Sequence, residues 1–313
     1  MENNRLNLLS LIVPVYNEVE TLPHLRVAIE GWKVSLGTIC LEVILVNDGS
    51  MDGSDAFCIR WASEDAMVKY VQFSRNFGHQ QAVSAGLACA QGDVAVIIDA
   101  DLQDPLSVIN TMIKKYEDGF DIVYGQRSAR HGETKFKKFT AWLYYRIMRR
   151  FVHKNLPVDT GDFRLISRRC IEVFNAMPET HRFLRGMFAW MGFKQTSVLY
   201  ERHKRLAGKT KYPLYKMLSF AWSGITSFSS FPIRLLSLVG VFFAFFGFGV
   251  CLYSLVSYFF SYTVQGWTSL MGVQSLLSGM ILLSVGIVGE YVGKIYEEVK
   301  NRPSYIISKK INL

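Results

Sequence analysis

Short apolar runs alternate with amphipathic and polar segments through residues 8–124 of the chain. Five of these runs are rich in β-branched residues and predict buried strands, at Leu8–Val15, Leu41–Val46, Val68–Phe73, Val94–Ile98 and Ile122–Tyr124. Helical patterns lie between them, at Glu20–Leu36, from His79 through Ala90 and at Pro105–Glu117. Strands that alternate with helices predict an α/β fold with a doubly wound, mostly parallel sheet, in which the carboxyl ends of the strands share one edge.

The fourth apolar run leads directly into Asp99-Ala100-Asp101-Leu102-Gln103-Asp104-Pro105. Asp99 and Asp101 are two residues apart, so their side chains point the same way if the backbone stays extended. Oxygen ligands at that spacing suit a hard divalent cation. An Asp-rich turn that caps the helix beginning at Pro105 is the alternative, and these residues alone leave the two interpretations open.

Two other strands also end in polar, turn-forming residues. Pro14-Val15-Tyr16-Asn17-Glu18 follows the first run, and Asn47-Asp48-Gly49-Ser50 follows the second. Neither a G-x-G-x-x-G nor a G-x-x-x-x-G-K-[ST] motif occurs, so a phosphate ligand would have to be neutralised in another way. A divalent cation at Asp99 and Asp101 would supply the positive charge.

The C-terminal part of the chain is apolar, and no residue between Arg234 and Glu290 carries a formal charge. One membrane crossing needs about 20 apolar residues, and a turn-like break at 263–269 divides this interval into two expected transmembrane helices, about 235–260 and 271–293. Lys and Arg flank both spans but are missing from the loop between them, which favours a cytoplasmic position for both chain ends. The N-terminus lacks a signal-peptide pattern, so the large N-terminal part is expected in the cytoplasm. A buried hairpin of a soluble protein is the alternative.

Charge and composition change this picture little. The formal charge of +9 could suit nucleic acid, but segment 127–154 interleaves many Lys and Arg with aromatic residues and contains a single acid, Glu133. That pattern favours an interfacial amphipathic helix at about 136–151 on an anionic membrane surface or lipid phosphate, and no nucleic acid partner is expected. A solvated basic helix is the alternative. The five cysteines lack metal-ligand spacing.

Four motifs of this chain resemble those of family-two glycosyltransferases with the GT-A fold, and they occur in the same order: Pro14–Glu18, Val46–Ser50, Asp99–Pro105 and Arg205–Lys211. The resemblance is greatest to polyprenyl-phosphate glycosyltransferases, the group that includes dolichol-phosphate mannose synthases and bacterial bactoprenol glucosyltransferases. It covers nearly the whole chain, including the two apolar spans. It implies a cytoplasmic GT-A domain (1–211), a juxtamembrane interfacial segment (212–231), two transmembrane helices (232–297) and a cytoplasmic basic tail (298–313).

The resemblance also implies a donor site. The family's nucleotide-sugar-binding positions fall on Pro14, Tyr16, Glu18, Asp48, Asp99 and Arg205, and its Mg²⁺ or Mn²⁺ ligands fall on Asp99, Asp101 and Gln103. The second motif has Asn47 where the family often has another acid. Arg205 would close over the donor diphosphate, with Thr210 and Lys211 nearby.

On the acceptor side, the resemblance assigns phosphate binding to Arg127 and Lys138, and a catalytic role to Asp162 beside Asp101. A polyprenyl phosphate is mostly a dianion at neutral pH, because its second pKa is near 6, so it needs no general base. Asp162 is therefore expected either as a base or as an orienting partner of the acceptor or of a basic group such as Arg164. His181, Arg182 and Arg185 are expected to frame the sugar or the acceptor.

Together these features predict an inverting transferase in the bacterial inner membrane, tetrameric by resemblance. It would move a hexose, expected to be glucose from UDP-glucose, to undecaprenyl phosphate at the cytoplasmic face, as a donor for cell-surface glycan modification. UDP-N-acetylglucosamine, UDP-galactose and GDP-mannose are alternative donors. A processive polysaccharide synthase is disfavoured because its Q-x-x-R-W motif is absent. An inactive nucleotide-sugar-binding scaffold is disfavoured by the intact acids Asp48, Asp99 and Asp101.

Overall fold

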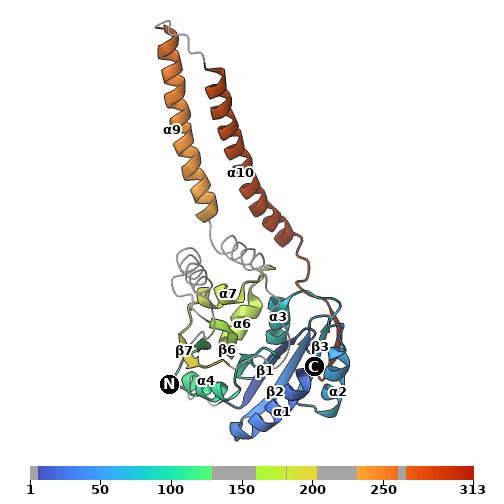
Figure 1. The fold of residues 1–313 in the computed structure, drawn as a ribbon. Coiled ribbons are helices and arrows are strands. Elements are labelled where there is room, and N and C mark those ends of the chain that lie inside the picture. The colour runs from blue at the N-terminus through green and yellow to red at the C-terminus, as the bar shows by residue number, and fades with distance from the viewer. Residues whose placement is uncertain (1–5, 129–159, 181, 203–230, 260–265) are drawn as a thin grey trace. The chain divides into compact units, whose positions relative to one another are not determined.

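The computed structural model of this chain describes residues 6–128, 160–180, 182–202, 231–259 and 266–313 (Figure 1). The chain divides into two compact units. One consists of Met1–Leu218 together with Pro303–Leu313, and the other of Ser219–Arg302.

The first unit is built on a mixed, mostly parallel sheet whose eight described strands have the order β7-β5-β6-β4-β1-β2-β3-β8. Parallel pairs join β1 to β2 and β4, β2 to β3, and β5 to β7. β6 is antiparallel to β4 and β5, and β8 is antiparallel to β3. The strands are β1 (Leu8–Val15), β2 (Cys40–Asn47), β3 (Val68–Phe73), β4 (Val94–Ile97), β5 (Ile122–Arg127), β6 (Thr160–Ser167), β7 (Gln195–Tyr200) and β8 (Ile307–Ile311).

Helices cover the sheet because its central strands are apolar on both faces. The described helices of this unit are α1 (Leu22–Lys33), the 3₁₀ turn η1 (Val34–Leu36), α2 (Ser54–Glu64), α3 (His79–Cys89), α4 (Ser107–Glu117), α6 (Arg168–Ala176) and α7 (Leu184–Trp190). Alternate residues of β1, such as Leu11 and Val13, share one buried core with α1, α2 and α4. On the other face α3 packs against β1 so closely that a Cβ at Gly86 would lie 2.3 Å from Ile12 Cγ2. Glycine is therefore required at this crossing.

The predicted strands are all present, and β1 and β3 have the predicted bounds. The predicted helix Glu20–Leu36 is α1 followed by η1, and the helix expected from Pro105 begins two residues later as α4. Six described elements of this unit were not predicted: α2, β6, α6, α7, β7 and β8.

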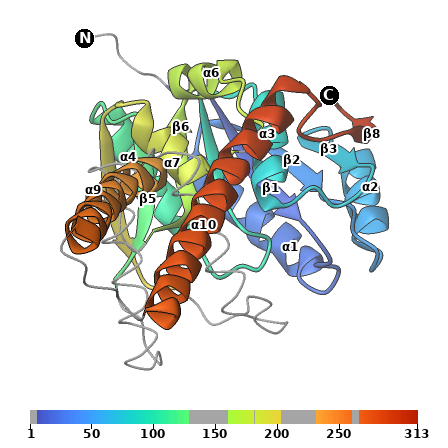
Figure 2. The same cartoon turned by 90° about the horizontal axis from the view of Figure 1, so that it is seen from above.

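The segment expected to be a basic tail returns to the sheet as β8, which lies beside β3 at the sheet edge (Figure 2). Tyr305 stacks on Phe73 with 4.9 Å between ring centroids, and Ser74 N donates to the carbonyl of Ile306 at 3.0 Å. The side-chain amide of Asn312 donates to the carbonyl of Val68 at 2.8 Å. The end of the chain is thus an integral part of the first unit.

The second unit contains two long helices, α9 (Phe231–Phe259) and α10 (Trp267–Val299), where the sequence predicted two apolar spans. Within the described part of the chain, Leu276–Val299 is the one helical stretch that is long and apolar enough to cross a membrane by length and composition. Membrane insertion of both helices stays a prediction.

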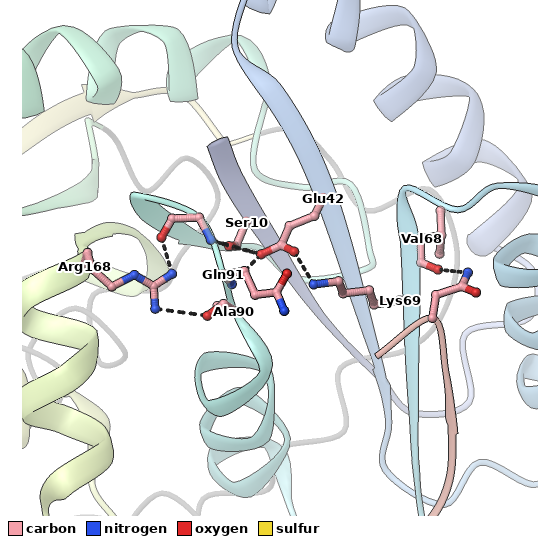
Figure 3. Close-up of polar contacts among 9 residues, drawn as sticks. Ser10, Glu42, Val68, Lys69, Ala90, Gln91 and Arg168 are labelled. Carbon is pink, nitrogen blue, oxygen red and sulfur yellow. Dashed lines mark hydrogen bonds and ion pairs between the residues drawn. The ribbon is translucent and has the colours of Figure 1, made fainter. Parts of the chain in front are cut away.

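A buried polar network crosses the parallel strands near their amino ends (Figure 3). At its centre Glu42 accepts hydrogen bonds from the hydroxyl of Ser10, from Lys69 Nζ at 2.5 Å and from the backbone N–H of Gln91 at 2.6 Å. The N–H of Gly92 lies 3.2 Å from the same carboxylate. Burial alone would raise the pKa of Glu42, but the bonds from Lys69, Ser10 and Gln91 outweigh it, so the pKa lies below its ordinary value. The buried charge is therefore paired and hydrogen-bonded.

Candidate active site

The candidate active site lies at the opposite edge, where the parallel strands have their carboxyl ends. Asp48 follows β2 and Asp99 follows β4. Because β6 is antiparallel to β4 and pairs Arg164 with Ile97, continuing the register by two residues places Asp162 opposite Asp99. The antiparallel strand therefore brings an acid from its amino end to the edge that holds the other two.

Asp48 is buried and held by backbone N–H groups. It accepts hydrogen bonds from the N–H of Phe77 at 2.6 Å and of Gly78 at 3.0 Å. Burial raises the pKa of Asp48 above its usual value although these N–H groups and the nearby His79 and Arg75 oppose the shift. Asn47, which departs from the family pattern, donates to the Tyr70 hydroxyl at 3.0 Å and accepts from Ser50 N at 2.9 Å. In this protein Asn47 shapes the turn that presents Asp48.

The first motif is tied to the second. Asn17 adopts a left-handed backbone conformation (φ 55°), and its N–H donates to the Ser50 hydroxyl at 3.0 Å. The N–H of Glu18 donates to the Ser54 hydroxyl at 3.0 Å. Pro14 is buried within β1, whereas the Tyr16 side chain is 44% exposed. Among the residues of the first motif that were predicted to bind the nucleotide, Tyr16 has an exposed side chain.

Asp99 and Asp101 lie at the turn after β4. Asp101 is buried and accepts a hydrogen bond from the N–H of Gln103 at 3.1 Å, across Leu102, which has a left-handed φ of 55°. That conformation is uncommon for a bulky residue and marks a turn whose shape is fixed by its surroundings.

Asp99 has a 39% exposed side chain. Its pKa is nevertheless raised, first by burial and then by the negative charges of Asp104, Asp162 and Asp101, which together outweigh His79. Repulsion within a group of carboxylates is relieved by a divalent cation, so the oxygen donors fit Mg²⁺ or Mn²⁺. No group of three or more His, Cys, Asp or Glu side chains among residues 6–128, 160–180 and 182–202 has the arrangement of a metal site. The ligand set Asp99, Asp101 and Gln103, which has two acids and an amide, stays a prediction.

Asp104 does not cap the helix that follows, contrary to one interpretation of the sequence. α4 begins at Ser107, and its N-cap, Leu106, makes no side-chain capping bond. The buried Asp104 carboxylate instead accepts a hydrogen bond from the Tyr200 hydroxyl, and Arg202 Nε lies 3.5 Å from it. The cap interpretation was wrong because the partners of Asp104 come from β7 and the residues just after it, which the local sequence does not reveal.

Asp162 is surrounded by basic groups. Arg185 Nε donates to its Oδ1 at 2.9 Å, and an Arg164 nitrogen lies 3.5 Å from the same oxygen. Burial alone would raise the pKa of Asp162, but Arg185, His79 and Arg164 outweigh it and hold the pKa well below the usual range. A carboxylate with so low a pKa has little tendency to accept a proton at neutral pH. Of the two roles expected for Asp162, this environment favours orientation over base catalysis.

His79 completes the group and was not singled out in the sequence. Its Nε2 lies 3.4 Å from Asp162 Oδ2 and 3.9 Å from Asp99 Oδ1. Burial lowers the pKa of His79, but Asp162 and Asp99 outweigh it and raise the pKa to about 9. The signal that could have found it was its position, because Arg75–His79 follows the carboxyl end of β3 as the motifs follow β1, β2 and β4.

The residues predicted for the acceptor side lie in different surroundings. Arg127 ends β5, and within the described residues its buried Nε has no hydrogen-bond partner; its guanidinium lies close to Gly161, one residue before Asp162. Arg182 donates to the carbonyl of Met177 at 3.0 Å and stacks on a ring, so it stabilises its own loop. Three other predicted residues, Lys138, His181 and Arg205, lie outside the described residues, as do Thr210 and Lys211.

Residues 10–174 match the model of glycosyl transferase family 2, which is more than half of the chain. The chain belongs to this family. It is therefore a glycosyltransferase, and the site at the sheet edge is its candidate active site.

Relatives of this glycosyltransferase match along nearly its whole length. An uncharacterized glycosyltransferase, YkcC, of Bacillus subtilis (strain 168) is 44% identical to this chain, and the match covers 97% of this chain and 94% of YkcC. A bactoprenol glucosyl transferase of Shigella phage SfII is 37% identical, with coverages of 96% and 97%. The structure of mannosyl-3-phosphoglycerate synthase from Rubrobacter xylanophilus has 16% identity and a TM-score of 0.50 over 75% of each chain, which shows the same fold. The predicted GT-A fold is confirmed.

Proposed function

We propose that this glycosyltransferase transfers a hexose from a nucleotide sugar to a polyprenyl phosphate. One observation carries the proposal: a bactoprenol glucosyl transferase is 37% identical to this chain over 96% of its length, so the likeness includes the residues of α9 and α10 as well as the catalytic unit. Glucose from UDP-glucose is the proposed donor.

In this proposal the donor lies along the carboxyl ends of β1, β2 and β4. Asp48, Tyr16 and Glu18 would bind the nucleoside, and Asp99, Asp101 and Gln103 would hold Mg²⁺ or Mn²⁺. A bound cation would neutralise charge on the diphosphate that leaves. Burial and the neighbouring acids raise the pKa of Asp99, which supports a site that a bound cation would stabilise.

The acceptor phosphate would approach from the side of β5 and β6. Arg127 would bind its oxygens, because guanidinium groups pair well with phosphate. One phosphate oxygen forms a bond to the anomeric carbon while the bond from that carbon to the diphosphate oxygen breaks, which inverts the configuration. Since the acceptor is already a dianion, alignment contributes more than proton removal. An ionised Asp162 would orient the neighbouring basic groups.

We further propose that α9 and α10 both cross the membrane, with the catalytic unit and both chain ends in the cytoplasm. The length and apolar composition of Leu276–Val299 support one crossing, and the uncharged sequence of α9 after Arg234 supports the other. A lipid acceptor would then be held in the same membrane as the enzyme.

Membranes that contain the full-length chain, supplied with undecaprenyl phosphate, Mg²⁺ and a panel of labelled nucleotide sugars, would test the proposal. The expected result is label in an organic-extractable lipid, greatest with UDP-glucose, with membranes lacking the chain as control. Labelling of the lipid by another sugar would support the proposed reaction and show that the donor is not UDP-glucose. No labelled lipid with any donor would refute the transfer and favour a nucleotide-sugar-binding scaffold.

A further inference from the structure

His79 occupies the position between the donor and acceptor sides of the site. Asp99 belongs to the proposed donor side, and Asp162 lies on β6 next to Gly161, which the guanidinium of Arg127 approaches. The imidazole Nε2 lies within 4 Å of a carboxylate oxygen on each side, at 3.9 Å from Asp99 and 3.4 Å from Asp162. His79 therefore contacts an acid on each side of the site.

We propose that His79 is a positioning residue for sugar transfer: it fixes the carboxylates of Asp99 and Asp162 relative to each other. The inference rests on the proposed function and adds a residue to it.

The two oxygens of Asp162 have separate partners, which gives His79 a distinct task. Oδ1 is held by Arg185 at 2.9 Å and faces Arg164 at 3.5 Å. Oδ2 is the oxygen that faces His79. Arg185 and His79 thus hold different oxygens of the carboxylate. Without His79 the cationic group that lies near both Asp162 and Asp99 would be lost, and the two negative charges would repel each other. Loss of the imidazole would therefore move the acids without removing either of them.

The local backbone does not depend on the imidazole. The turn before α3 is fixed by the bonds from the N–H groups of Phe77 and Gly78 to Asp48, and by the bond from Gln81 N to the Gly78 carbonyl at 3.0 Å. The His79 side chain is 33% exposed, so it fills no core space that another side chain would have to replace. A change of side chain at His79 should leave Asp48, and therefore nucleoside binding, in place.

The test compares His79→Ala and His79→Gln with wild type in the full chain, in membranes with undecaprenyl phosphate. Formation of labelled lipid, release of nucleoside diphosphate and the affinity for UDP are measured separately. His79→Ala should lower kcat by about 10- to 100-fold, the usual effect of misplacing catalytic groups, and change the UDP affinity by less than about threefold. His79→Gln, which keeps an N–H donor, should recover a large part of the loss. The matched control is His24→Ala, an exposed histidine of α1, which should behave as wild type.

Each outcome decides the matter. A kcat for His79→Ala within twofold of wild type would overturn the proposal. Equal loss in both variants, with UDP affinity falling in parallel, would also overturn it, because His79 would then only stabilise the loop. If wild type releases nucleoside diphosphate but labels no lipid, the proposed acceptor is wrong, and the comparison of variants by nucleoside diphosphate release still decides the role of His79.

Discussion

The buried ion pair between Lys69 and Glu42 gives a quantitative test of how the sheet is stabilised. In Lys69→Met the ammonium group is lost, but Glu42 keeps three donors, from Ser10, Gln91 and Gly92. Removing one partner of a buried pair costs about 3–5 kcal/mol, and the remaining hydrogen bonds place this case at the lower end, about 3 kcal/mol. For a folded unit of this size each kcal/mol shifts Tm by about 2–4 °C, so Tm should fall by about 6–12 °C.

The assay is thermal unfolding of the full-length protein in detergent, with the exposed Lys114→Met on α4 as the matched control. Because the pKa of Glu42 is lowered by folding, its stabilising effect is complete above the unfolded pKa, about 4.3, and is lost as the pH falls through the lower folded pKa. Lys69 is the main group that lowers this pKa, so without it Glu42 takes up a proton at a higher pH than in wild type, and the difference in Tm between wild type and Lys69→Met should be largest at neutral pH and shrink as the pH falls. A difference under about 2 °C at pH 7 would refute the reasoning.

Three further predictions concern the active site. Asp101→Asn should reduce transfer by at least about 10²-fold while Tm changes little, since it removes charge from the proposed cation site; normal lipid labelling by this variant with added Mg²⁺ would contradict the ligand assignment. Arg127→Ala should raise the KM for the lipid acceptor more than the KM for the donor, and an unchanged acceptor KM would count against its role. Gly49→Ala should weaken UDP binding and lower Tm. Gly49 has a φ of 71°, and a Cβ there would lie 2.6 Å from backbone atoms of Arg75 and Asn76. A UDP affinity equal to that of wild type would show that the loop accommodates the added methyl group.

The sequence predicted the central parallel strands β1, β2, β3 and β4 well because they are buried on both faces. β1 and β4 are almost wholly apolar, and the polar residues that end these strands lie at one edge of the sheet. β6 and β8 were not predicted, and both carry charged residues. β6 contains Asp162 and Arg164, which pair with each other and with residues of other elements, and β8 has two lysines, as is common on edge strands.

The same limit applies to the site. Asp48, Asp99 and Asp101 could be found because they lie close after the ends of apolar strands. The opposition of Asp162 to Asp99 depends on the register of an antiparallel pair, and the link from His79 to both acids depends on that register as well. The cap interpretation was wrong for Asp104 because its partner, Tyr200, is distant in sequence and is brought to Asp104 only by the folded sheet.

Because β8 is the last strand of the chain, the sheet can be completed only at the end of synthesis. β8 follows α9 and α10 in the chain, so the outer edge of β3 stays without its neighbour until the ribosome has made both apolar helices. An unpaired strand edge can pair with another chain and cause aggregation, and a nascent chain is exposed to this risk until β8 is made. A nascent chain that stops after α10 would contain the carboxylates of the site together with an unpaired outer edge of β3.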